Sequence, residues 1–127
     1  MKMRTALGAM AFVLIAGCTS RPIYNVADAP VVTSGKAASM QDVQGAIIRA
    51  GSSLGWKMSP AEPGLVVGRL DLRTHTAIVN VRYDVKTYSI TYKESVNLDA
   101  DGTNIHKNYN GWIENLDRGI RSELLRV

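Results

Sequence analysis

The sequence predicts an α+β domain with two layers: a sheet of about four mainly antiparallel strands, and two helices on one of its faces. Two observations predict this class. Apolar and polar residues alternate with a period of two in successive segments between Thr76 and Lys93, which is typical of antiparallel strands with one wet face. On both sides of the strand region, apolar residues recur at steps of three and four, which is typical of amphipathic helices. The order helix, strands, helix therefore predicts a strand meander packed against an N-terminal and a long C-terminal helix.

The first helix is expected to begin after Ser39, whose side chain suits an N-cap, with Asp42 acidic in the first turn. Gly51 is expected to end this helix as a C-cap. The apolar face of the helix is formed by Met40, Val43, Ala46, Ile47 and Ala50. A short strand over residues 55–58 follows and ends before Pro60.

Three longer strands are expected after it. The first covers residues 65–72, and a tight turn at residues 73–75 leads into the second. Residues 84–86 separate the second strand from the third. The apolar positions of these strands are expected to face the helices: Val66, Leu70, Leu72, Ala77, Val79, Val81, Tyr83, Tyr88, Ile90 and Tyr92.

The C-terminal helix is expected from Ile105 onward, after a turn at residues 99–102. Gly111 weakens this helix by about 1 kcal/mol relative to alanine, and its place beside Trp112 indicates close packing against the sheet. The apolar face of the helix is formed by Ile105, Tyr109, Trp112, Ile113, Leu116, Ile120 and Leu124.

Residues 1–17 have the layout of a secretory signal. Lys2 and Arg4 make a basic head, and residues 5–16 carry no charge. About 12 apolar or small residues rise only about 18 Å as a helix, which is too short for a hydrocarbon core of about 30 Å. This pattern predicts a cleaved signal peptide and not a membrane span.

The segment Ile15-Ala16-Gly17-Cys18 resembles the lipobox of bacterial lipoproteins, and Cys18 is the only cysteine of the chain. The resemblance implies cleavage between Gly17 and Cys18, a diacylglycerol on the Cys18 sulfur and an acyl chain such as palmitate on the new amine. Several such chains make release from a membrane very slow, because each buried methylene contributes about 0.8 kcal/mol. In enteric-type bacteria, Thr19 in place of aspartate implies the periplasmic leaflet of the outer membrane rather than the inner membrane.

Three regions follow from these features: the signal peptide 1–17, a lipidated N-terminus with a flexible tether 18–38, and a single domain 39–127. The tether is rich in Ala, Pro, Ser, Thr and Val, and as a flexible coil it would span about 25 Å. An alternative is that residues 22–26 dock as an extra edge strand or act as a partner's ligand.

Composition and spacing exclude several functions. Without Lys2 and Arg4 the charge falls from +4 to about +2 with no basic cluster, so we expect no nucleic-acid partner. A lipidated Cys18 leaves no thiol for a disulfide or for catalysis. His75 and His106 have no metal-ligand spacing, so we expect neither a metal nor another cofactor. A serine nucleophile and a histidine base could be chosen from Ser89, Ser95 and His106. We expect no such catalytic site, because the sequence has no glycine elbow or oxyanion loop to accompany them.

The segments 88–98 and 105–113 resemble those of a group of small uncharacterised bacterial lipoproteins, which share a Tyr-Ser-Ile-x-Tyr strand and an Ile-His-x-x-Tyr-Asn-x-Trp-Ile helix. The resemblance implies an α+β domain and no particular activity. The candidate interaction residues are Tyr88, Tyr92, Tyr109 and Trp112. They could instead form the seam between the last strand and the last helix, with their hydroxyls at its rim.

Two hypotheses about function result. The favoured one is a non-catalytic, lipid-anchored module that faces the periplasm and contacts an envelope protein or the cell wall. The alternative is a small-ligand carrier, or less plausibly a hydrolase, that uses an aromatic face of Tyr88, Tyr92 and Trp112.

Overall fold

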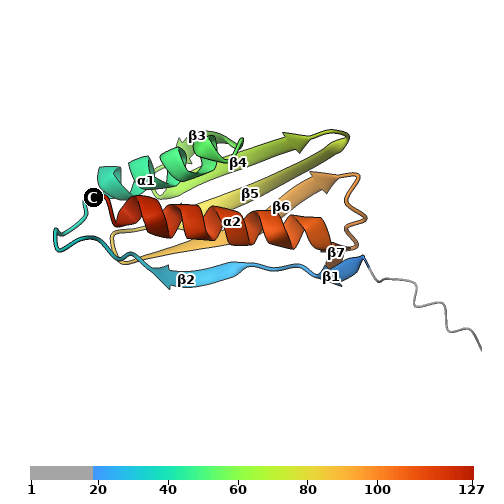
Figure 1. The fold of residues 1–127 in the computed structure, drawn as a ribbon, viewed down its shortest axis with the longest axis horizontal. Coiled ribbons are helices and arrows are strands. Elements are labelled where there is room, and N and C mark those ends of the chain that lie inside the picture. The colour runs from blue at the N-terminus through green and yellow to red at the C-terminus, as the bar shows by residue number, and fades with distance from the viewer. Residues whose placement is uncertain (1–18) are drawn as a thin grey trace, which may run out of the picture.

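The computed structural model of the chain describes residues 19–127 and confirms the α+β class (Figure 1). The signal peptide and Cys18 lie outside the described residues. In chain order the elements are β1 (Ser20–Pro22), β2 (Val26–Pro30), α1 (Met40–Ser53), β3 (Lys57–Glu62), β4 (Leu65–Leu72), β5 (His75–Tyr83), β6 (Thr87–Val96), β7 (Asn104–His106) and α2 (Lys107–Leu124).

The main sheet has five strands in the order β2-β6-β5-β4-β3, and all neighbours are antiparallel. The predicted meander is β3 to β6, and β2 adds a fifth strand at its edge. The alternative of an extra edge strand at residues 22–26 was right about an added edge strand, but the segment that pairs with β6 is Val26–Pro30. A second sheet of two strands pairs β1 with β7. Both helices lie over the same face of the main sheet and pack against each other (Figure 1). The core between these layers contains the fully buried residues Val43, Ile47, Val66, Val79, Val81, Tyr88, Ile90, Ile113, Leu116 and Ile120.

The flexible tether expected for residues 18–38 is wrong for the part that the structure describes. β2 pairs with β6, and Val26 and Ala29 are only 6% and 7% exposed because they cover the side of the core next to β6. Farther along, the Val31 amide donates to the Lys86 carbonyl (2.9 Å). The composition misled because edge strands and linkers share proline and small polar residues. The folded domain therefore begins by Thr19 and not at Ser39.

Helix α1 begins as predicted. Ser39 accepts from the Asp42 amide through its hydroxyl, and the Asp42 carboxylate accepts from the Ser39 amide, which completes a capping box. These bonds hold the pKa of Asp42 below its ordinary value. The predicted end at Gly51 was wrong, because the helix continues to Ser53 and Gly51 is buried against Met58. The left-handed residue after the helix is Gly55, at φ +91°.

Helix α2 begins two residues later than expected, because residues 104–106 pair with β1 as a short strand. The predicted close contact at Gly111 was also wrong, since a Cβ built there meets no described atom within 4 Å apart from its chain neighbours and the local backbone of its own helix. The close approach is at Gly119, where a Cβ would lie 3.4 Å from Ala50 Cβ and Leu54 Cδ1. Leu72 was expected in the core and is exposed, because the β4–β5 hairpin extends past the end of α1 (Figure 1).

Two glycine substitutions should therefore have opposite effects on stability. Gly111→Ala should raise the free energy of unfolding by about 0.5–1 kcal/mol, because alanine favours the helix and meets open space. Gly51→Ala should lower it by about 1–3 kcal/mol, because the new methyl would lie 2.3 Å from Met58 Sδ and force the side chain to move. Urea unfolding of the chain 19–127 measures both, and a destabilising Gly111→Ala would contradict the open surroundings described.

Candidate interaction surfaces

The four aromatic candidates divide into two buried and two half-buried residues. Tyr88 and Tyr109 are fully buried where β6 packs against α2, so neither offers a ring to a ligand at the surface. The Tyr92 ring meets the Tyr109 ring edge to face at 5.7 Å, and Trp112 lies 6.5 Å from the ring of His75. Only Tyr92 and Trp112 reach solvent.

A buried carboxylate that the sequence did not single out joins this seam. Asp117 is 5% exposed, and its Oδ1 accepts a hydrogen bond from the Tyr88 hydroxyl (2.5 Å). Its Oδ2 pairs with the Arg121 guanidinium at 2.9 Å, one helical turn later. Burial first, and then the bond to Asp117, raise the pKa of Tyr88 above its ordinary value. The sequence analysis missed Asp117 because it belongs to the polar face of α2 by periodicity. Both of its oxygens are bonded, so its role is structural.

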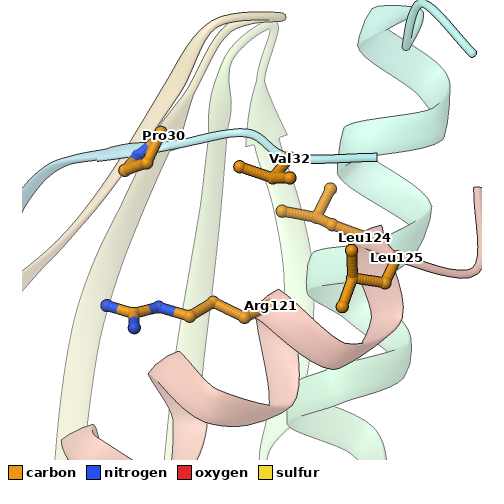
Figure 2. Close-up of a pocket in the computed structure, with 5 residues that line it drawn as sticks. All are labelled: Pro30, Val32, Arg121, Leu124 and Leu125. Atoms are coloured by element: carbon orange, nitrogen blue, oxygen red, sulfur yellow. The ribbon is translucent and has the colours of Figure 1, made fainter. Parts of the chain in front are cut away.

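An apolar groove lies where the segment after β2 crosses the C-terminal end of α2 (Figure 2). Its volume is about 320 Å³, and it is lined by Pro30, Val32, Arg121, Leu124 and Leu125. Val32 and Leu125 are each 53% exposed, and Figure 2 shows them on either side of Leu124. The sequence did not predict this groove, because Val32 was assigned to the tether and Leu125 lies one residue beyond the predicted apolar face of the C-terminal helix.

A second hollow, of about 380 Å³, is open and polar. It lies beside the β5–β6 turn, and its lining includes Asp28, Arg82, Asp84 and Ser89. Asp84 accepts from the amides of Lys86 and Thr87, and these bonds hold its pKa below the ordinary value. Ser89 Oγ accepts from the Asp28 amide (2.9 Å). These polar groups thus serve the turn and the pairing of β2 with β6.

The described end of the chain nearest Cys18 is fastened to the fold. The Thr19 carbonyl accepts from the Lys107 amide (2.7 Å), and β1 then pairs with β7. The Asn110 side chain donates to the Pro22 carbonyl (2.9 Å) and accepts from the Tyr24 amide (3.0 Å). Residues 19–24 are therefore held against β7 and the first turns of α2.

The histidines and serines also have local roles. His75 Nδ1 donates to the Asn97 carbonyl (2.6 Å), and His106 is the N-cap of α2, with Nδ1 accepting from the Asn108 amide. Ser95 Oγ bonds the Tyr92 hydroxyl (2.8 Å). His106, Ser95 and Ser89 thus bond the Asn108 amide, the Tyr92 hydroxyl and the Asp28 amide, so within residues 19–127 these three side chains are engaged with other groups of the fold. Within that range no group of three or more His, Cys, Asp or Glu side chains could hold a metal ion.

Comparisons with known proteins add no relative. No protein-family model, no curated protein and no solved structure matches the chain. Of the helices in the described part of the chain, neither is long and apolar enough to cross a membrane. The functional argument therefore depends on the sequence motif at residues 15–18 and on the surfaces described above.

Proposed function

We propose that the protein is a periplasm-facing envelope lipoprotein, anchored by lipid on Cys18, that acts as a non-catalytic accessory module for another envelope component. The observation that carries the proposal is the lipobox-like segment Ile15-Ala16-Gly17-Cys18, which immediately precedes the part of the chain that the structure describes. Cleavage before Cys18 would leave Thr19 as the second residue, which favours the outer membrane.

The surroundings of the polar side chains support a module without catalysis. Asp117, the buried charged residue of the described range, is bonded through both oxygens to Tyr88 and Arg121. His75 and His106 are bonded to the backbone of a loop and of a helix N-terminus. Groups that serve the fold in this way are poorly placed to bind and transform a substrate.

The ligand-carrier alternative has less support. A carrier would need the rings of Tyr88, Tyr92 and Trp112 around a hollow, yet Tyr88 is buried in the seam. Neither of the two hollows described above is lined by any of these three residues. We therefore favour the accessory module.

Cys18→Ser tests the anchor. We expect the natural chain to stay with the membrane fraction after a high-salt wash, because acyl chains are insensitive to salt. The Cys18→Ser chain should be released, and Thr19→Ser, which keeps the thiol, should behave as the natural chain. The mass of the mature N-terminus should show both lipid groups on Cys18. If Cys18→Ser remains in the washed membranes, the anchor proposal is wrong.

The accessory role needs a second measurement. Crosslinking of intact cells that express a tagged chain should yield a discrete envelope partner, and this partner should be lost when Cys18→Ser removes the anchor. The absence of a partner at every crosslinker length would contradict the accessory role and leave the anchor untouched.

A further inference from the structure

The link between the proposed anchor and the fold is a single peptide unit. Cα atoms of consecutive residues are about 3.8 Å apart, so residue 18 stays within that distance of Thr19. Thr19 itself is held by the 2.7 Å bond from the Lys107 amide to its carbonyl, and residues 20–22 pair with β7. The flexible span of about 25 Å that a tether over residues 18–38 would supply is therefore missing.

The residues around Thr19 form one end of the domain. Figure 1 shows that β1, β7, the β4–β5 turn and the connection from β6 to β7 all lie at this end. Hydrogen bonds join these segments: Asn97 Nδ2 donates to Thr74 Oγ1 (3.0 Å), and the His106 amide donates to the Leu98 carbonyl (2.9 Å). We name residues 19–21, 72–75 and 96–107 the anchor end. The opposite, distal end contains the β5–β6 turn and residues 121–127.

The anchor end has a nearly balanced charge. Its exposed basic residues are Arg21, Arg73 and Lys107, and its exposed acidic residues are Asp99 and Asp101. Leu72 and Val96 are exposed apolar side chains in the same region. Such a surface is neither strongly attracted to nor repelled by anionic lipid, because attraction to lipid headgroups grows with the number of basic residues. Contact with lipid at this end would therefore depend on the covalent link.

We propose that the anchor end lies against the lipid headgroups, held there by the one-residue link, and that the distal end faces away from the membrane. The inference rests on the proposed lipid anchor at Cys18. It assigns the anchor end a lipid surface as its partner. It also places the groove of Pro30, Val32 and Leu125 on the side that points into the periplasm.

The test compares one position at each end. Thr103→Cys and Val85→Cys introduce a single reactive thiol in exposed loops before β7 and between β5 and β6, since lipid occupies the Cys18 sulfur. Each lipidated chain is labelled with a fluorophore and reconstituted into phosphatidylcholine vesicles that contain a lipid with a nitroxide headgroup. Because the ten residues of β6 separate the two loops by about 30 Å, quenching at position 103 should exceed that at position 85 roughly threefold or more.

A matched chain carries about 15 Gly and Ser residues between Cys18 and Thr19, a spacer of about 20 Å. With this spacer, quenching at position 103 should fall towards the value at position 85. Equal quenching at the two positions without the spacer would overturn the inference, and so would quenching at position 103 that the spacer leaves unchanged. Failure of the natural chain to carry lipid or to float with vesicles would instead overturn the anchor itself, so the two failures are distinguishable.

Discussion

A chain that begins at Ser39 is expected to lose most of the stability of the domain, although the sequence alone places the domain boundary there. The deletion removes β2, whose Val26 and Ala29 are buried beside β6, and leaves Tyr88 and Ile90 uncovered along that edge. Lost burial and lost backbone hydrogen bonds together cost about 5 kcal/mol or more. Small domains are stable by only about 5–15 kcal/mol in total, so the shortened chain should be largely unfolded.

The measurement is urea unfolding of chains 19–127 and 39–127, followed by circular dichroism. The longer chain should show one cooperative transition, and the shorter one a weak transition or none. Val26→Asp in the longer chain is a matched variant, because it keeps every residue and places a charge in the position that β2 buries. Equal stability of the two chains would mean that residues 19–38 are a tether after all.

The parts of the fold that the sequence predicted are those with long local patterns. β4, β5 and β6 contain eight to ten residues each, so their alternation was visible, and the bounds of β4 were correct. The start of α1 was predictable because its N-cap residue, Ser39, and its capping partner, Asp42, lie within four residues of each other. β1, β2 and β7 have only three to five residues, which is too short for a period to be recognised. These short strands form because they pair with strands that are distant in the sequence: β1 with β7, and β2 with β6.

The surfaces were less predictable than the strands. Asp117 appears polar and exposed by helical periodicity, and only the position of Tyr88 on β6 explains its burial. The groove is lined by Val32 and Leu125, which are more than 90 residues apart in the sequence. A local sequence pattern cannot predict that two such distant segments lie together. Of the aromatic residues proposed from the sequence, Tyr88 and Tyr109 are fully buried, and the sequence pattern could not tell a buried ring from an exposed one.

Tyr88→Phe and Tyr109→Phe are expected to change stability in opposite directions, although both remove one buried hydroxyl. The Tyr88 hydroxyl donates a hydrogen bond to the buried Asp117 carboxylate, so the loss of this hydroxyl should lower the free energy of unfolding by about 1–3 kcal/mol. The Tyr109 hydroxyl is buried without a hydrogen-bond partner among residues 19–127, so its removal should be neutral or stabilise by about 1 kcal/mol. A clear destabilisation by Tyr109→Phe would reveal a partner for that hydroxyl, such as a bound water.

In alkaline solution both substitutions should gain stability relative to the natural chain. Burial raises the pKa of both tyrosines, so the folded state keeps them protonated at a pH where the unfolded chain, with an ordinary pKa of about 10, releases the protons. Stability is then fully present below pH 10 and falls above it, by up to about 1.4 kcal/mol per pH unit for each tyrosine. Replacing either tyrosine by phenylalanine removes the part of this alkaline fall in stability that the replaced tyrosine causes. The advantage of Tyr109→Phe over the natural chain should therefore grow above pH 10, whereas the deficit of Tyr88→Phe should shrink. Unfolding curves at pH 7, 10 and 11 measure both trends, and parallel curves for all three chains would contradict the burial of the two hydroxyls.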